Sequence, residues 1–95
     1  MMPKRRVPTH PGKVLLEESL RPLRITQVRF ARHLGIPLQR VGEIVRGRRG
    51  ITPATARLFG QALGPTPESW VSLQAAHDLA VSGPARRVAA MRRAG

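Results

Sequence analysis

The strongest constraint on the fold lies in the twenty residues from Gln27 to Arg46. Ala31 occupies the fifth position of this window and Gly35 the ninth. Apolar side chains occupy its tenth, fifteenth and eighteenth positions, which are Ile36, Val41 and Ile44. Glycine adopts positive φ at no steric cost, and a small residue lets two helix backbones come close together. The window therefore predicts a helix-turn-helix motif, in which two short helices cross steeply over a tight turn.

Capping residues and prolines mark further short helices along the chain. Thr26, Thr52 and Thr66 stand at N-cap positions, and a proline follows the latter two at the first helical position. Pro22 is expected to end the first helix. The five expected helices cover residues 11–21, 27–34, 37–46, 53–63 and 67–82. Since the sequence contains no alternating strand pattern and no hairpin dipeptide, we predict an all-α fold.

Each expected helix has an apolar stripe that we assign to the core. Along the chain these stripes are Leu16, Leu20 and Leu23; Val28, Ala31 and Leu34; Val41, Ile44 and Val45; Ala56, Phe59, Ala62 and Leu63; and Trp70, Leu73, Ala76, His77 and Ala80. We expect the helices to form one domain over residues 12–83, with a flexible basic arm over 1–11 and a basic tail over 84–95.

The chain is strongly basic, which restricts the partners that it can bind. It has 95 residues, with 17 Lys and Arg against 5 Asp and Glu, and a formal net charge of +12. Seven basic residues lie before Gly12 or after Gly83, so the segment between them still carries a charge of +5. Lysine and arginine gain affinity by releasing counterions from a phosphate backbone, so nucleic acid is the expected partner. A membrane surface is not expected, because no long helix pairs a continuous apolar face with a lysine-rich one.

Several classes of function are excluded by residues that the chain lacks. It has no cysteine for a disulfide or a thiolate zinc site, no apolar run that could span a membrane and no signal peptide, so we expect a cytoplasmic protein. His10, His33 and His77 have no carboxylate pair beside them, which argues against a catalytic triad or a metal site. No glycine motif for phosphate binding occurs. We therefore expect a protein that is not an enzyme and that uses no cofactor and no small-molecule substrate.

Several sequence blocks between Pro8 and Val81 follow the pattern of one family. They are Thr9-His10-Pro11-Gly12, Thr26-Gln27, Ala31-Arg32-His33-Leu34-Gly35-Ile36 and residues 43–53, 62–64 and 67–74. These blocks resemble the HigA/VapI branch of the Xre/Cro repressor family, which are the antitoxins of HigBA-type toxin–antitoxin operons. The last block, with its Trp-x-x-Leu-Gln segment, is the most specific, since ordinary Xre repressors lack it. Pro37 departs from the pattern, because the family usually has a capping Ser or Thr there.

The resemblance implies a five-helix Xre/lambda-repressor-like domain that forms a homodimer, binds a palindromic operator and represses its own operon. It also implies that the chain neutralises a small HigB-like toxin of the RelE type, which cleaves mRNA. Such toxins are basic, so Glu17 and Glu18 are the acidic cluster available to bind one. Two alternatives remain: a stand-alone Xre-family regulator without a toxin partner, and a protein that binds nucleic acid non-specifically through charge alone.

In this architecture the second helix of the motif enters the major groove with its N-terminus first. We therefore expect the base-reading residues to be Leu38, Gln39, Arg40 and Glu43. Gln39 suits adenine and Arg40 suits guanine. Glu43 can instead pair with Arg40 or Arg46, and we favour this alternative. The residues expected to bind phosphates are Thr26, Gln27, Arg46, Arg48 and Arg49, although the arginines can also serve only solubility.

We place the twofold axis of the dimer near the fifth helix, with contacts from Trp70, Leu73 and Leu79. A dimer is expected because one recognition helix reads too few base pairs for tight, specific binding. The alternative for Trp70 is packing in the core. The segment Lys4-Arg5-Arg6 can lie in a minor groove, but we favour a disordered arm that adds non-specific affinity.

Overall fold

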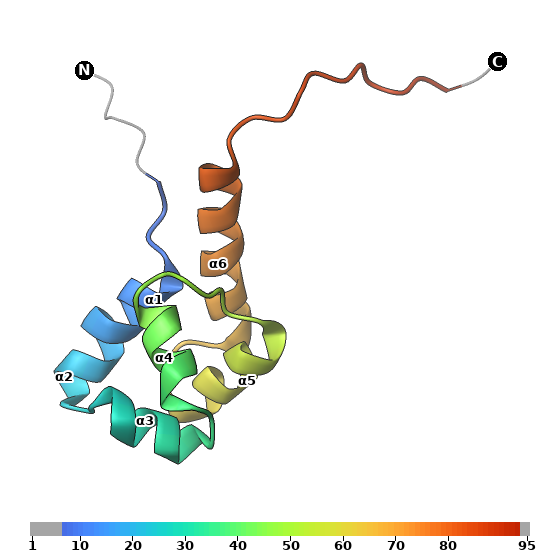
Figure 1. Cartoon of the computed structure of the whole chain (residues 1–95). Coiled ribbons are helices and arrows are strands. Elements are labelled where there is room, and N and C mark those ends of the chain that lie inside the picture. The colour runs from blue at the N-terminus through green and yellow to red at the C-terminus, as the bar shows by residue number, and fades with distance from the viewer. Residues whose placement is uncertain (1–6, 94–95) are drawn as a thin grey trace, which may run out of the picture.

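The computed structural model describes residues 7–93, and every regular element in that range is a helix (Figure 1). The first helical segment consists of α1 (Pro11–Val14), η1 (Leu15–Leu20) and α2 (Arg21–Leu23), which follow one another without a break. The remaining helices are α3 (Gln27–Leu34), α4 (Leu38–Val45), α5 (Pro53–Ala62) and α6 (Pro67–Ser82). The all-α prediction and its five helices are therefore confirmed over the described range. Lys4, Arg5, Arg6 and the last two residues of the tail lie outside the described residues.

Local capping fixes the starts of the helices. Thr26, Thr52 and Thr66 each accept a hydrogen bond on Oγ1 from the backbone N–H three residues further on, at 3.1, 3.2 and 3.1 Å. At α1 the cap is His10, whose Nδ1 accepts from the Gly12 N–H at 2.9 Å. These bonds supply partners for N–H groups that the first turn of a helix otherwise leaves without one.

The first helical segment ends later than predicted, because it passes through Pro22. Proline has no N–H, and its ring clashes with the carbonyl group four residues earlier in an α-helix. The preceding turn, η1, is a π-helix, in which the Arg21 N–H donates to the carbonyl oxygen of Leu16. This wider turn makes room for the proline ring. The segment ends at Leu23, and Arg24 follows in a left-handed conformation with a φ of 55°.

The wide turn also changes which leucines face the core. Leu15 and Leu20 are buried, whereas Leu16 is half-buried and Leu23 is 58% exposed. The predicted stripe is therefore wrong except at Leu20. Residues five apart lie about 140° from each other around an α-helix, and a π-turn between them reduces that angle. The prediction assumed α-helical periodicity throughout, which the proline prevents.

Three aromatic rings form the centre of the core. The Phe59 ring lies between those of Phe30 and Trp70, and the ring centroids are 5.3 Å apart in each pair. Phe30 takes the place of the predicted Val28, which is 48% exposed. Both residues fit the period of a short helix, and phenylalanine turns inward because it buries more apolar area. The indole N–H of the buried Trp70 has no hydrogen-bond partner among the described residues.

The C-terminal part of α6 projects beyond the other helices (Figure 1). Ala76 and Ala80 are therefore exposed, which corrects their assignment to the apolar stripe of this helix. On the side that faces the domain, His77 Nδ1 lies 2.8 Å from the carbonyl oxygen of Pro8. The contact ties Pro8 to α6, so this part of the expected arm is bound to the domain. Residues 83–93 form neither helix nor strand.

The first helical segment meets α4 at Gly12. A Cβ atom added here would lie 2.6 Å from the carbonyl carbon of Ile44 and still closer to its oxygen. Only glycine allows two backbones to approach this closely. The contact fixes the position of α4, which is the second helix of the predicted motif.

Candidate nucleic-acid interface

The corner between α3 and α4 has the geometry that the sequence predicts. Gly35 follows α3 with a φ of 73°, in the left-handed region. Its N–H and that of Ile36 both donate to the carbonyl oxygen of Ala31, at 2.9 and 3.1 Å. Val41 and Ile44 are fully buried on the inner side of α4. Because this inner side is anchored in the core, the opposite side of α4 faces outward.

The outward side of α4 begins with three of the residues predicted to read bases. Leu38 is 47% exposed, Gln39 is exposed and Arg40 is half-buried. They form the first turn of the helix, after the N-cap residue Pro37. No side chain of the described residues caps this turn, which leaves its outer side uncovered.

The start of α3 carries two of the residues predicted to bind phosphates. Thr26 is exposed and Gln27 is half-buried. Thr26 Oγ1 already accepts a hydrogen bond from the Arg29 N–H. A hydroxyl group that accepts one bond can still donate its proton, so Thr26 can cap the helix and bind a phosphate oxygen together.

Glu43 has a different partner from the two that were predicted. Its Oε2 accepts from Arg49 Nε at 2.9 Å, while Arg40 and Arg46 form no ion pair with it in the described part of the chain. The Arg49 hydrogen bond outweighs partial desolvation and holds the pKa of Glu43 below its ordinary value, and Gln39 and Arg46 act in the same direction. The carboxylate is therefore ionised and bonded to Arg49. This bond removes Glu43 from the predicted base-reading set.

Arg46, Arg48 and Arg49 lie in the segment 46–50, which we call the arginine loop, and all three are exposed. The chain reverses at Gly47, which has a φ of 74°, and the Arg48 N–H donates to the Glu43 carbonyl oxygen at 2.8 Å. The reversal brings Arg49 back to α4 and explains its pairing with Glu43. The three arginines thus form one basic cluster at the C-terminal end of α4.

Two residues that support the arginine loop were not predicted. Gln74 of α6 accepts a hydrogen bond from the Ile51 N–H at 2.8 Å. The His10 ring lies beside Gly47, where an added Cβ would be 3.7 Å from its Cγ. The one sequence signal for Gln74 is a polar residue near the inward side of an otherwise apolar helix, which by itself names no partner.

The α6 residues predicted to form a dimer interface differ in exposure. Leu79 is 75% exposed, whereas Leu73 is half-buried against the core. Trp70 is fully buried beside Phe59, so its assignment to a dimer contact is wrong and the alternative of core packing is correct. A side chain without accessible surface cannot contact a second copy of the chain.

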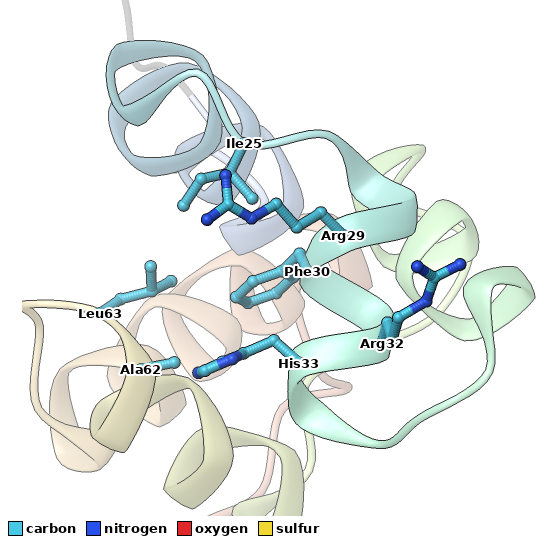
Figure 2. A pocket seen from close by; sticks show the side chains of 7 residues that line it. All are labelled: Ile25, Arg29, Phe30, Arg32, His33, Ala62 and Leu63. Atoms are coloured by element: carbon cyan, nitrogen blue, oxygen red, sulfur yellow. The ribbon is translucent and has the colours of Figure 1, made fainter.

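A hollow of about 390 Å³ lies beside α3 (Figure 2). It is lined by Ile25, Arg29, Phe30, Arg32, His33, Ala62 and Leu63. None of the residues predicted to contact DNA belongs to this lining, so the hollow is not part of the candidate interface. Within residues 7–93, no three potential metal ligands come together and no helix is long and apolar enough to cross a membrane.

The anchored corner and the outward side of α4 define a helix-turn-helix protein. No family model matches the chain. It is 40% identical over 70 residues to virulence-associated protein I of Dichelobacter nodosus, which covers 74% of this chain and 65% of that protein's length. It is 34% identical over 79 residues to antitoxin HigA-1 of Vibrio cholerae, which covers 83% of this chain and 74% of the relative.

A solved structure gives the same result. Pseudomonas aeruginosa antitoxin HigA with the higBA promoter matches with a TM-score of 0.76 and 33% identity, over 79% of this chain and 82% of that one. The chain belongs to the HigA family of helix-turn-helix antitoxins.

Proposed function

We propose that the chain is an antitoxin and transcriptional repressor that binds a palindromic operator as a dimer. The observation that carries this proposal is the outward side of α4, where Leu38, Gln39 and Arg40 stand on a helix anchored from behind. An α-helix fits the major groove, where the base edges distinguish all four base pairs. The HigA relative solved with promoter DNA supports this mode of binding.

Base reading is assigned to the first turn of α4. The amide of Gln39 suits adenine and the guanidinium of Arg40 suits guanine, because each pair can form two hydrogen bonds. Leu38 supplies an apolar contact for a thymine methyl group. Glu43 acts indirectly, since its ion pair holds Arg49.

Phosphate binding is assigned to the start of α3 and to the arginine loop. Thr26 and Gln27 present polar groups at a helix N-terminus, where an anion is favoured. Arg46, Arg48 and Arg49 supply exposed positive charge after α4. With residues 12–83 as the specific unit, the basic segments 1–11 and 84–95 add affinity that does not depend on sequence.

The dimer contact is assigned to α6. Leu79 is a large apolar side chain on the projecting part of this helix, and Leu73 lies about a turn and a half before it on the same helix. Pairing of two copies would cover Leu79 and supply two recognition helices. Two helices read two half-sites, which gives an operator with twofold symmetry.

The second activity is neutralisation of a small, HigB-like mRNA-cleaving toxin in the cytoplasm, by binding and without catalysis. The names of the relatives support it. Glu17 and Glu18 are exposed on η1, and Glu17 has only a loose ion pair, 3.9 Å from Arg21. Such exposed pairs contribute little, so these carboxylates remain available to a basic partner. The net charge of +12 opposes binding of a basic toxin, which keeps a stand-alone regulator as the second candidate.

A mobility-shift assay on the DNA upstream of the chain's own reading frame tests operator binding. We expect a complex at nanomolar protein that survives non-specific competitor DNA at physiological salt. Binding that competitor DNA removes would favour the non-specific alternative. Selection of bound DNA from a random pool should yield a twofold repeat.

Two matched arginine variants test the site assignments. Arg40→Ala should relax sequence preference at one position, whereas Arg48→Ala should weaken binding to all sequences equally. An equal, uniform loss in both variants would show that the base-reading assignment is wrong. Co-purification with the product of the neighbouring reading frame tests the toxin partner, and no binding to it would favour the stand-alone regulator.

A further inference from the structure

Gln74 is a buried polar residue on the inner side of α6, and it faces the end of the arginine loop. Its exposed fraction is only 8%. A Cβ added to Gly50 would lie 3.2 Å from Gln74 Cδ, so the side chain packs directly against the loop backbone. Burial of an amide is unfavourable unless its donor and its acceptor both have partners.

Both ends of this amide have a partner. Oε1 accepts from the Ile51 N–H at 2.8 Å, and Nε2 donates to Asp78 Oδ1, one turn further along α6, at 2.9 Å. The Asp78 carboxylate can only accept and the Ile51 N–H can only donate, so the two partners fix the orientation of the amide. A bond to a charged acceptor is also stronger than a neutral one.

The arginine loop is thereby fixed at both ends. At its start, the turn at Gly47 is closed by the bond from the Arg48 N–H to the Glu43 carbonyl oxygen. At its end, Ile51 is buried and bonded to Gln74. The exposed side chains of Arg48 and Arg49 lie between these two points. A loop that is already ordered loses less conformational entropy when it binds a ligand.

We infer that Gln74 is a positioning residue for DNA binding, which together with Asp78 holds the arginine loop so that Arg48 and Arg49 meet phosphates. This inference rests on the proposed function. It also places the loop support and Leu79, the proposed dimer contact, next to each other on α6. One helix therefore connects the joining of two copies with the grip on the DNA backbone.

The salt dependence of operator binding separates positioning from a purely structural role. The slope of log K against log salt falls by about 0.9 for each phosphate contact that is lost. Gln74→Leu keeps a side chain of similar size but leaves the Ile51 N–H without its acceptor. We expect its slope to fall by about 1–2, the contribution of two arginines, and affinity for operator and random DNA to fall by the same factor. A purely structural role would lower the melting temperature and leave the slope unchanged.

An exchange of donor and acceptor gives a rescue test. Gln74→Glu sets a carboxylate against Asp78 and should also lower the slope. Adding Asp78→Asn lets the new carboxylate accept from both Ile51 and the new amide, at the same net charge as the wild type. The slope of the double variant should return toward the wild-type value.

Asp78→Ala covers the case in which Gln74→Leu fails to fold, because Asp78 is exposed. It frees the amide of Gln74 and should lower the slope, although it raises the net positive charge. Leu63→Ala is the control, since this half-buried residue lies at the far end of α5 from the loop. It should destabilise the fold and keep the wild-type slope.

The outcomes are distinct. A wild-type slope in Gln74→Leu and Asp78→Ala, or an equal fall in Leu63→Ala, overturns the inference. The wild-type protein is measured first against operator and random DNA. If it does not distinguish them, the proposed function fails instead, before any variant is compared.

Discussion

Replacement of Gly12 by alanine is predicted to force the first helical segment away from α4. The new Cβ would lie 2.6 Å from the carbonyl carbon of Ile44 and closer to its oxygen. Both are backbone atoms within α4, so no side-chain rotation relieves the contact. The helices must move apart by about 1 Å or more to restore ordinary van der Waals distances. That movement would also loosen the packing of Leu15 and Ile44, which are both fully buried.

The expected loss of stability is large for a domain of this size. Overpacking costs about 1–3 kcal/mol where side chains can adjust, and occasionally more. Because the contact is between backbones, we expect about 3 kcal/mol, even after the helix propensity that alanine adds. Small domains have a total of about 5–15 kcal/mol. The melting temperature should fall by about 12–24 °C, at about 4–8 °C for each kcal/mol.

Urea unfolding of the wild type, Gly12→Ala and Gly64→Ala provides the measurement. Gly64→Ala is the matched control, since a Cβ there meets no atom within 4 Å. Its stability should stay within about 0.5 kcal/mol of the wild type. If Gly12→Ala unfolds at the same urea concentration as the control, the conclusion that close backbone contact fixes α4 is refuted. Operator affinity should fall with stability, because α4 loses its support.

Three further variants test local features. Gly42→Ala should stabilise α4 by about 0.5–1 kcal/mol, because the new Cβ meets only the mobile end of the Arg46 side chain, at 3.1 Å; a lower melting temperature would contradict this. Arg24→Gly should stabilise the fold by up to about 1 kcal/mol in urea unfolding, because φ is 55° at this position, and a loss would show that the arginine side chain matters more than the strain. Burial, and then the charge of His77, lowers the pKa of His10, so the unfolded chain binds the proton more readily. Stability from neutral His10 is therefore present above about pH 6.5 and lost as the pH falls below it. His10→Ser, which can still cap α1, should show a smaller decrease in melting temperature between about pH 7.5 and pH 5, and an unchanged decrease would argue against His10 as the titrating group.

The helix boundaries could be predicted because their signals are local. A threonine cap depends on a hydrogen bond three residues along the chain, and Gly35 needs only its own backbone to adopt positive φ. The spacing of Ala31, Val41 and Ile44 likewise depends on two neighbouring helices. These features are decided within about ten residues, which is the range over which periodicity and capping are informative.

The orientation of the first helical segment could not be predicted from the same signals. Pro22 stays within the helix because a π-turn precedes it, and that turn exchanges Leu16 for Leu15 in the core. In α3, the choice between Val28 and Phe30 depends on the partner ring of Phe59. Each of these outcomes is decided by what the segment packs against, which the local pattern does not contain.

The candidate site shows the same division. The exposed first turn of α4 follows directly from the motif, whereas the partner of Glu43 does not. Helical spacing offers Arg40 and Arg46, but the reversal at Gly47 brings in Arg49 from outside the helix. Gln74 lies 23 residues from Ile51 in the sequence, so only the fold brings them together.

The buried indole of Trp70 has a practical consequence. The chain has one tryptophan and no tyrosine, so a single chromophore dominates its ultraviolet emission. In the native state that ring is shielded from water and its N–H has no partner among the described residues, so the emission should lie at short wavelength. Unfolding exposes the ring to solvent and should shift the emission to the red. The core thus contains an intrinsic fluorescent reporter, and stability can be followed on the unlabelled protein.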